Sequence, residues 1–375
     1  MEQLKQLTLH HLHEELGARS APFAGYAMPV QYDAGVLTEH MHTREQAGLF
    51  DVSHMGQVML TGPDFDTVAL GLETLVPNDA LSLPDARQRY GFFTNTGGGL
   101  LDDLMFARRR DDIYVVVNAA RKAHDLALLT AALEPLGVTV TEQTDRALLA
   151  LQGPKAEAVL ASMDPTAASM KFMDVADLDL DGTTAWVSRS GYTGEDGYEI
   201  SVLNDQAEAL ARKLLADPRV LPIGLGARDS LRLEAGLCLY GHDIDTTTTP
   251  VQANLLWAIQ KTRRAEGQRA GGFPGAEAVF GEIKTQPERQ RVGLLPEGRA
   301  PMREGVMLFL EALGGDPIGS ITSGGFGPTV GHPIAMGYLP TASCVVGTRV
   351  WGELRGKRLP LHVAPLPFIP NNFKR

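Results

Sequence analysis

Two adjacent carboxylates follow a run of three glycines in GGGLLDDLMF, residues 97–106. The glycines predict a turn, and the two acids then enter an otherwise apolar strand. Because successive side chains of a strand point to opposite faces, one of Asp102 and Asp103 must point toward the buried side or a cleft. A carboxylate in a partly apolar cleft can act as an acid, a base or a stabiliser of positive charge. The alternative, favoured by composition alone, is that both acids cap a turn at the strand entrance.

A second acid interrupts a strand in SGYTGEDGYEI, residues 190–200. Three glycines within seven residues predict a tight loop that exposes its backbone, and Glu199 lies in the strand that follows. Its carboxylate could hold a planar heterocycle with adjacent N–H donors through charge-assisted hydrogen bonds. An exposed Glu on an edge strand explains the spacing equally well.

The helix predicted over residues 227–235 carries a positively charged residue, Arg228, near its start. Arg228 there opposes the helix dipole, which stabilises anions near a helix N-terminus. This local cost predicts a partner carboxylate for Arg228, and the alternative is a salt bridge to Asp229 or Glu234.

Familiar catalytic and metal-binding patterns are missing. The sequence has no Walker A loop, no HExxH, no GxSxG and no GxGxxG after a strand. Ser53 and His54 in DVSHM are sequence neighbours and therefore diverge, which argues against a nucleophile and base pair. Cys238 and Cys344 have no metal-ligand spacing, so we expect two reduced thiols and no metal.

An internal repeat indicates how these residues are positioned. MLTGP at 59–63 and ALQGP at 150–154 both read as strand, glycine turn and Pro at the start of a helix. DIYVVV at 112–117 and DGYEIS at 196–201 form a second matching pair, each followed by a helix rich in Ala and Leu. Two similar α/β lobes are predicted, although such junctions can recur by chance.

The pattern of predicted secondary structure changes from about residue 283 onward. Short strands are predicted at 292–295, 306–310 and 345–350, separated by Gly and Pro turns, which is typical of a small β-barrel or sandwich. Residues 263–275 have the composition of a connector between the two parts.

Composition limits the class of protein. The chain has 375 residues, 40 Gly and 23 Pro, so a turn-rich protein of two or three domains is expected. Its formal net charge of −11 argues against nucleic acid or an anionic membrane as the main partner. Residues 1–20 lack the apolar stretch of a signal peptide and are too acidic for a transit peptide, so a cytoplasmic location is expected.

Several separated motifs together resemble one family. FDVSHMG, GGGLLDDL, VVVNA, SGYTGEDGYEI, ARDSLRLEAGLCLYGHDID and TSGGFGPTVGHPIAMGY closely resemble the T-protein of the glycine cleavage system, the aminomethyltransferase family. They follow the family order from Asp51 to Tyr338, which covers nearly the whole chain. The chain also resembles, more distantly, the folate-binding domains of dimethylglycine and sarcosine oxidising enzymes.

The resemblance implies an α+β cloverleaf. Two interleaved α/β lobes with antiparallel sheets, residues 1–275, are expected to form a folate site, and residues 284–375 a C-terminal β-barrel. It further implies a reaction in which an aminomethyl group on the lipoyl arm of the H-protein passes its one-carbon unit to tetrahydrofolate. Ammonia leaves, and 5,10-methylenetetrahydrofolate and the dihydrolipoyl carrier form. The P- and L-proteins are the implied functional partners, and no metal is needed.

The family motifs also imply site residues. Asp103 corresponds to the catalytic carboxylate, and Glu199 to the residue that holds the pterin. The further substrate or folate-binding residues are Met55, Tyr90, Asn118, Tyr192, Arg228 and Phe373. Phe373 departs from the Tyr of other members, which removes a hydroxyl contact and leaves stacking possible.

Two other functions remain open. A folate-binding or folate-sensing protein without transfer chemistry is one, and a demethylase acting on N-methyl amines, which normally needs a flavin unit, is the other. Family carriers are typically acidic, so a local basic patch is expected for docking. Arg108 to Arg110 and Lys261 to Arg264 are the candidates, with solvated surface charge as the alternative for each.

Overall fold

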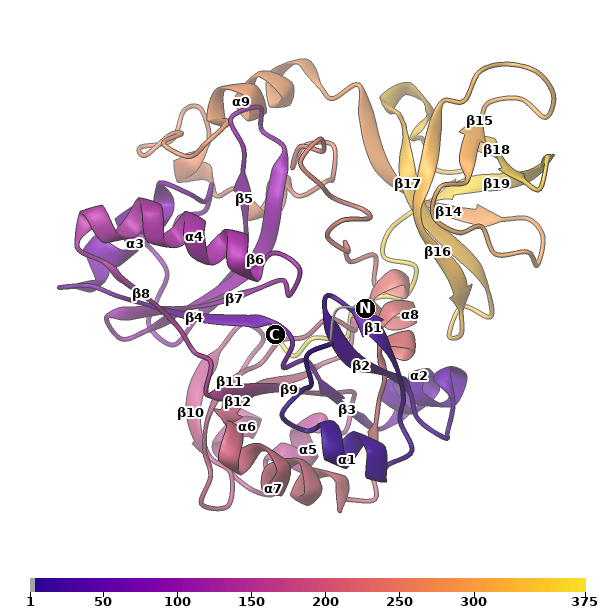
Figure 1. The fold of residues 1–375 in the computed structure, drawn as a ribbon. Helices are drawn as coiled ribbons and strands as arrows, with labels where there is room; N and C mark the ends of the chain where they lie inside the picture. The colour runs from indigo at the N-terminus through magenta and orange to yellow at the C-terminus, as the bar shows by residue number, and fades with distance from the viewer. Residues whose placement is uncertain (1–3) are drawn as a thin grey trace.

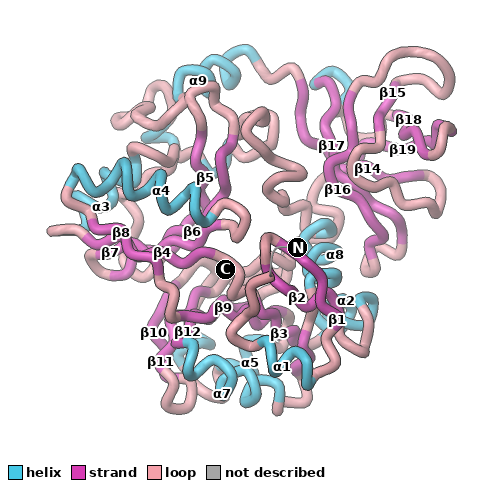
Figure 2. The backbone as a smooth tube through the Cα atoms, in the orientation of Figure 1, coloured by secondary structure: helices cyan, strands magenta, loops and turns pink. Residues whose placement is uncertain are grey.

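Three sheet-based units surround a common centre in the computed structural model, which describes residues 4–375 (Figure 1). Two are open sheets, and the third is a closed six-stranded barrel. Helices cover the outer faces of the open sheets, whose inner faces are turned toward each other (Figure 2). The predicted α+β class with a C-terminal barrel is therefore confirmed. Within the described residues, no helix has the length and apolarity to cross a membrane.

The first open sheet has the antiparallel order β5-β6-β7-β4-β8. Its strands are β4 (Gly56–Thr61), β5 (Gln88–Thr94), β6 (Leu100–Arg109), β7 (Asp112–Val117) and β8 (Thr139–Glu142). The helices α3 (Phe65–Glu73) and α4 (Lys122–Leu133) and the short η1 (Glu134–Leu136) cover one face. Leu104 and Phe106 of β6 pack there with Val68 and Leu129, because alternate strand residues face the helices.

The second open sheet has the order β10-β11-β12-β9-β3-β13. Its strands are β3 (Ala47–Asp51), β9 (Arg146–Gln152), β10 (Val175–Asp179), β11 (Thr184–Ser188), β12 (Gly197–Leu203) and β13 (Val220–Pro222). The helices α1 (His10–Glu15), α5 (Ala156–Leu160), α6 (Thr166–Ser169) and α7 (Asn204–Leu215) lie on its outer side. Only the pairing of β13 with β3 is parallel among these strands.

The two sheets repeat one topology, as the sequence repeat predicted. In the first, β4 leads through α3 to β5, β6 and β7, and then through α4 to β8. In the second, β9 leads through α5 and α6 to β10, β11 and β12, and then through α7 to β13. The early strand β3 inserts between β9 and β13, which interleaves the lobes. Gly153 at the β9 turn has φ +127°, and a Cβ there would lie 2.3 Å from the Gln46 carbonyl oxygen, so no side chain fits.

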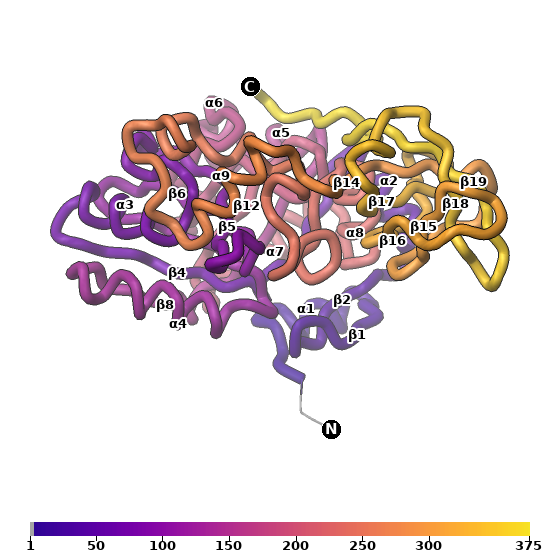
Figure 3. The backbone as a smooth tube through the Cα atoms, turned by 90° about the horizontal axis from the view of Figure 1, so that it is seen from above, coloured from indigo at the N-terminus to yellow at the C-terminus, as the bar shows by residue number. Residues whose placement is uncertain are grey.

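The barrel has the closed order β14-β17-β16-β15-β18-β19. Its strands are β14 (Arg289–Pro296), β15 (Met307–Phe309), β16 (Gly319–Gly327), β17 (His332–Pro340), β18 (Arg349–Leu354) and β19 (Lys357–Ala364), with η4 (Thr341–Ser343) after β17. The strand predicted at 345–350 begins later, at Arg349, because residues 345–348 form the turn that precedes it. Beyond β19 the chain returns to the second lobe (Figure 3), where Asn372 N donates to Gly194 O over 2.9 Å.

The remaining elements join these units. They are the hairpin β1 (Arg19–Phe23) and β2 (Tyr26–Gln31), the helices α2 (Val36–Glu45), α8 (Leu225–Glu234) and α9 (Ala276–Thr285), and the short turns η2 (Leu256–Ala258) and η3 (Lys261–Arg263). Residues 263–275 differ from a free connector: Arg263 is buried and its Nη1 lies 2.9 Å from Glu73 on the first lobe. Their Gly and Pro residues make turns within a packed segment.

Candidate functional site

Asp102 and Asp103 lie inside β6, so the alternative that both cap a turn is wrong. Strand alternation sends Asp102 toward α4, where its side chain is fully buried. Asp103 shares the opposite face with Met105 and Arg109, which line a cavity between the two open sheets. Asp103 therefore lies on the face of β6 that is turned toward the second sheet, although it does not itself line this cavity.

Asp103 is held by two donors from neighbouring strands. Tyr90 of β5 donates its hydroxyl to Oδ2 over 3.1 Å, and Asn118, just after β7, donates Nδ2 to Oδ1 over 2.7 Å. Burial, followed by the charge of Asp102, raises the pKa of Asp103 to about 7, although the bonds from Asn118 and Tyr90 oppose this rise. The carboxyl group can therefore exchange a proton near neutral pH.

Glu199 lies on β12, which pairs with β11 on one side and β9 on the other. The alternative of an exposed residue on an edge strand is therefore wrong. Its Oε2 accepts a hydrogen bond from Ser190 Oγ over 2.8 Å. Oε1 has no hydrogen-bond partner among residues 4–375, so it can accept from a ligand.

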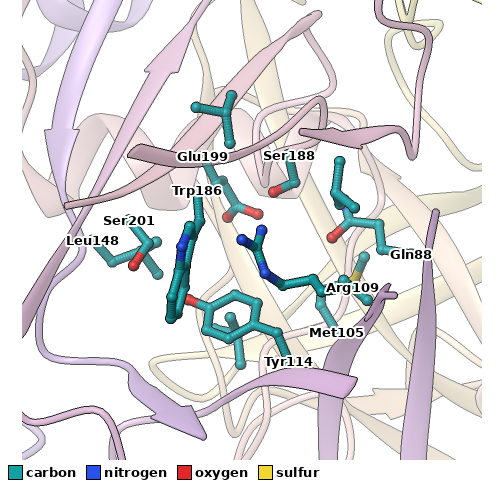
Figure 4. Close-up of a pocket in the computed structure, with 13 residues that line it drawn as sticks. Gln88, Met105, Arg109, Tyr114, Leu148, Trp186, Ser188, Glu199 and Ser201 are labelled. Carbon is teal, nitrogen blue, oxygen red and sulfur yellow. The ribbon is translucent and has the colours of Figure 1, made fainter. Parts of the chain in front are cut away.

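The cavity between the sheets is narrow, about 20 Å³, which is room for a water-sized group (Figure 4). Figure 4 shows Arg109 reaching from the first sheet toward Glu199 of the second, beside Trp186 and Tyr114. Its lining residues are Gln88, Met105, Ala107, Arg109, Tyr114, Val116, Leu148, Val175, Trp186, Val187, Ser188, Glu199 and Ser201. Both sheets contribute, so the fold of the two lobes against each other creates the site.

Arg228 and Tyr192 form a further part of the site. The Arg228 guanidinium lies 4.8 Å from the centre of the Tyr192 ring. Burial lowers the pKa of Arg228, and the charge of Glu199 opposes that effect. Asp229 pairs instead with Arg232, so the predicted alternative of a salt bridge to Asp229 is wrong.

The second alternative for Arg228, a salt bridge to Glu234, is also wrong. Glu234 pairs with His40 and Arg44 of α2. Nη1 of Arg228 is buried without a hydrogen-bond partner in the described chain. Together with Glu199, Arg228 thus offers a buried cation beside a carboxylate with a free oxygen.

Two predicted site residues remain, Met55 and Phe373, and the structure places them in different surroundings. Met55 is partly buried and packs on the cluster that includes Phe50 and Ala227, at the base of α8. Phe373 lies apart from the cavity lining, with its ring stacked on Phe172 at a centroid distance of 4.1 Å. The structure therefore brings Tyr90, Asp103 and Asn118 into direct contact but gives Phe373 a partner of its own in the second lobe.

Two residues of the site were missed at the sequence level. Trp257 stacks on Tyr90 at 5.2 Å and is 62% exposed, so an aromatic surface extends from Asp103 to solvent. Asp125 of α4 is fully buried behind Asp102. Trp257 could have been found from the sequence, because Trp is rare in this chain. Asp125 could not, because an acid in the first turn of a helix is too common to indicate a site.

Two residues of the predicted basic patch at Arg108 to Arg110 lie on opposite faces of the sheet, and Arg110 is exposed. Arg108 stacks on Phe65 at 3.5 Å, on the helix side of the sheet. Arg109 points to the other side, where it stacks on Trp186 and pairs with Asp177. Strand alternation separates Arg108 from Arg109, so these two side chains do not lie on one face, and a role of this segment in docking stays a prediction.

In the second candidate patch, Lys261 to Arg264, both arginines bond within the chain, whereas Lys261 is exposed. Arg263 is buried against Glu73, and Arg264 donates to the carbonyl oxygens of Leu256 and Ile259. Within residues 4–375, no cluster of three or more His, Cys, Asp or Glu side chains is placed to hold a metal ion.

Comparison with known proteins decides the family. Residues 9–263 match the family model "GCVT N-terminal domain", and residues 289–369 match "Glycine cleavage T-protein C-terminal barrel domain". The chain belongs to the glycine cleavage T-protein family. As a member of that family of aminomethyltransferases, it is an enzyme.

Individual T-protein relatives agree with this assignment over their full length. The chain is 43% identical to the human mitochondrial aminomethyltransferase, covering 99% of this chain and 92% of the relative. It is 41% identical to the Dictyostelium discoideum protein of the same name, covering 100% and 94%. The crystal structure of aminomethyltransferase T from Bartonella henselae matches with a TM-score of 0.93 and 44% identity over the whole of both chains.

The expected cytoplasmic location is wrong by this comparison. The curated T-protein relatives from Dictyostelium, fission yeast, potato, chicken and human are all named as mitochondrial. The expectation rested on the composition of residues 1–20, and a targeting segment is removed from a mature protein, so this composition does not fix location.

Proposed function

We propose that the protein transfers the one-carbon unit of an aminomethyl group, carried on the lipoyl arm of the glycine cleavage H-protein, to tetrahydrofolate. Ammonia is released, and 5,10-methylenetetrahydrofolate and the dihydrolipoyl carrier are formed. Membership of the T-protein family supports the reaction class. The observation that carries the proposal is Asp103, whose partly buried carboxyl group is held by Tyr90 and Asn118 and has a pKa of about 7.

Asp103 fits the charge that develops during this reaction. Sulfur-assisted loss of ammonia from the aminomethyl group leaves a cationic one-carbon unit, which N5 of the folate then attacks. A carboxylate fixed by Tyr90 and Asn118 stabilises that positive charge without reorganising. The same group can accept or return a proton at the folate nitrogens.

The residues around the cavity fit a pterin ring. Such a ring presents N–H donors beside a carbonyl acceptor, which suits the free Oε1 of Glu199 and the free Nη1 of Arg228. The narrow cavity admits only the edge of the ring at Glu199 unless flexible lining residues such as Met105 move. Trp257 and Tyr90 offer a stacking surface for the aromatic part of folate that remains nearer to solvent.

The test measures ammonia release from aminomethylated, lipoylated H-protein with and without tetrahydrofolate. Folate-dependent release that Asp103→Asn abolishes supports the proposal. Folate binding without ammonia release contradicts it and favours the folate-binding alternative. Release of formaldehyde from an N-methyl amine with an added flavoprotein contradicts it in favour of the demethylase.

A further inference from the structure

A second carboxyl pair lies directly behind Asp103, on the helix side of the first sheet. Asp102 of β6 and Asp125 of α4 are both fully buried, and their carboxyl groups lie within hydrogen-bonding reach of each other. Asp102 and Asp125 form what we term the rear pair.

The rear pair is joined to Asp103 through one side chain. Asn118 Nδ2 donates to Asp102 Oδ1 over 2.9 Å and to Asp103 Oδ1 over 2.7 Å. The backbone N–H of Asn118 donates to Asp102 Oδ2 over 3.1 Å. Asp102 therefore fixes both the backbone and the side chain of the residue that holds Asp103.

The rear pair must contain a proton. Two buried carboxylates in contact repel strongly, so ionising both at once is unfavourable. Oδ1 of Asp125 lies 3.0 Å from His124 Nδ1, whereas Oδ2 is buried with no donor among the described residues. A proton shared with Asp102 supplies the missing bond at Oδ2 and leaves one negative charge on the rear pair.

Titratable and charged groups face the rear pair from the start of α4, from Tyr240 and from Asp103. His124 lies on α4, and Arg121 caps its N-terminus. The Arg121 guanidinium also lies 5.6 Å from the centre of the Tyr240 ring, in the segment after α8. The charge of Asp103 acts on Asp125 from the opposite face of β6. Around Asp103 the facing groups are Tyr90 of β5, Tyr192 of the loop before β12, and Cys238.

We propose that Asp102 and Asp125 share one proton and are positioning residues, which hold Asn118 against Asp103 and keep a single negative charge behind it. This inference rests on the proposed function in one respect, namely that the proposed function gives Asp103 its catalytic role. The rear pair touches neither substrate nor the cavity lining. Its charge disfavours ionisation of Asp103, so it tunes the pH at which that carboxyl group exchanges its proton.

The two isosteric variants place the remaining charge differently. Asp125→Asn leaves the charge on Asp102, next to Asp103 in the chain, and Asp102→Asn leaves it on Asp125, across the sheet. The titration midpoint of Asp103 is therefore expected to be higher in Asp125→Asn than in Asp102→Asn, by roughly half a pH unit or more.

The midpoint is measured by infrared titration of the free protein. The C=O band of protonated Asp103 is isolated by subtracting the spectrum of the same variant carrying Asp103→Asn. Equal midpoints, or the reverse order, overturn the proposal. Asp205→Asn, an exposed acid in the first turn of α7 at the equivalent place in the second lobe, is the matched control and leaves the midpoint unchanged.

A measurement on the wild-type protein covers the case in which a variant fails to fold. At pH 8 a protonated carboxyl band must persist after Asp103 has ionised, and loss of all such bands overturns the proposal. Neither measurement needs substrate. A protein that shows the expected midpoints but releases no ammonia refutes the proposed function alone, and an active enzyme with equal midpoints refutes this inference alone.

Discussion

At the scale of single residues, Asp103 has the catalytic role in the proposed reaction. We expect Asp103→Asn to lower one-carbon transfer at least a hundredfold, which corresponds to about 3 kcal/mol of lost transition-state stabilisation. Folate binding should remain, because Asn keeps the shape of the side chain. Single-turnover ammonia release and folate titration measure the two effects. The exposed Asp111→Asn is the control, and near wild-type transfer in Asp103→Asn contradicts the assignment.

The raised pKa of Asp103 has a consequence for stability. Burial and Asp102 raise this pKa from 3.8 to about 7, so the folded protein binds this proton more tightly than the unfolded chain does. Its contribution to the free energy of unfolding is therefore present below about pH 4 and is lost as the pH rises through about 7.

Asp103→Asn removes this ionisation and should stabilise the protein above pH 7. Relative to the difference at pH 4, we expect a gain of roughly 2 to 4 kcal/mol at pH 8. Urea unfolding of both proteins at the two pH values measures it. A gain that does not depend on pH contradicts the raised pKa.

Glu199 is expected to determine folate affinity. Its free Oε1 can accept from a ring N–H, and a hydrogen bond to a charged group contributes about 1.5 to 3 kcal/mol. Glu199→Ala should therefore raise the folate dissociation constant by roughly 10- to 150-fold in isothermal titration. The exposed Glu266→Ala is the control, and an unchanged affinity in Glu199→Ala refutes the role.

At the scale of elements, α8 connects the site to the rest of the molecule. Its last residue, Glu234, is fully buried and accepts from His40 over 3.1 Å, Arg44 over 2.9 Å and the backbone N–H of Thr329 over 2.7 Å. Burial alone raises the pKa of Glu234, but His40, Thr329 and Arg44 outweigh it and hold the pKa at about 2.

A depressed pKa gives stability above the unfolded pKa that is lost as the pH falls toward 2. Glu234→Gln should therefore lower the free energy of unfolding by about 3 kcal/mol at pH 7. The difference between the variant and the wild type should become smaller as the pH falls below 4.5. Chemical unfolding across this pH range measures the effect. Glu208→Gln, in an exposed pair with Arg212, should cost less than about 0.5 kcal/mol throughout, and an equal cost for both variants contradicts the argument.

Local sequence patterns predicted the helices and strands better than they predicted the contacts between these elements. Alternation along β6 predicted that one of its two acids faces a cleft, and the Gly-Pro junctions predicted the repeated lobes. Asp125 could not be found this way, because its partner Asp102 lies on another element and only packing brings them together. The arginine run shows a related limit, since Arg108 and Arg109 point to opposite faces of the sheet although their charges adjoin in sequence.

At the scale of the whole molecule, a second buried acid links the barrel to the two lobes, in addition to Glu234, which accepts from the Thr329 backbone of the barrel. Asp243, in the segment after α8, accepts from Arg232 Nη1 over 2.8 Å and from Ser323 Oγ of β16 over 2.8 Å. The Tyr338 hydroxyl of β17 donates to its backbone carbonyl over 2.6 Å. Because Arg232 belongs to the helix that carries Arg228, this junction connects the barrel to the site.

Breaking a buried ion pair from one side costs about 3 to 5 kcal/mol, because it leaves an uncompensated charge. Asp243→Asn should therefore weaken the junction, and calorimetry should show a separate, earlier transition in place of cooperative unfolding of barrel and lobes. Asp229→Asn is a matched control, since Asp229 pairs with the same Arg232 over 2.7 Å but is 61% exposed, and it should change the free energy of unfolding by less than about 1 kcal/mol. If Asp243→Asn unfolds in a single transition as stable as that of Asp229→Asn, then Asp243 does not couple the barrel to the site, and the extensive packing of α8 on β16 and β17 must do so instead.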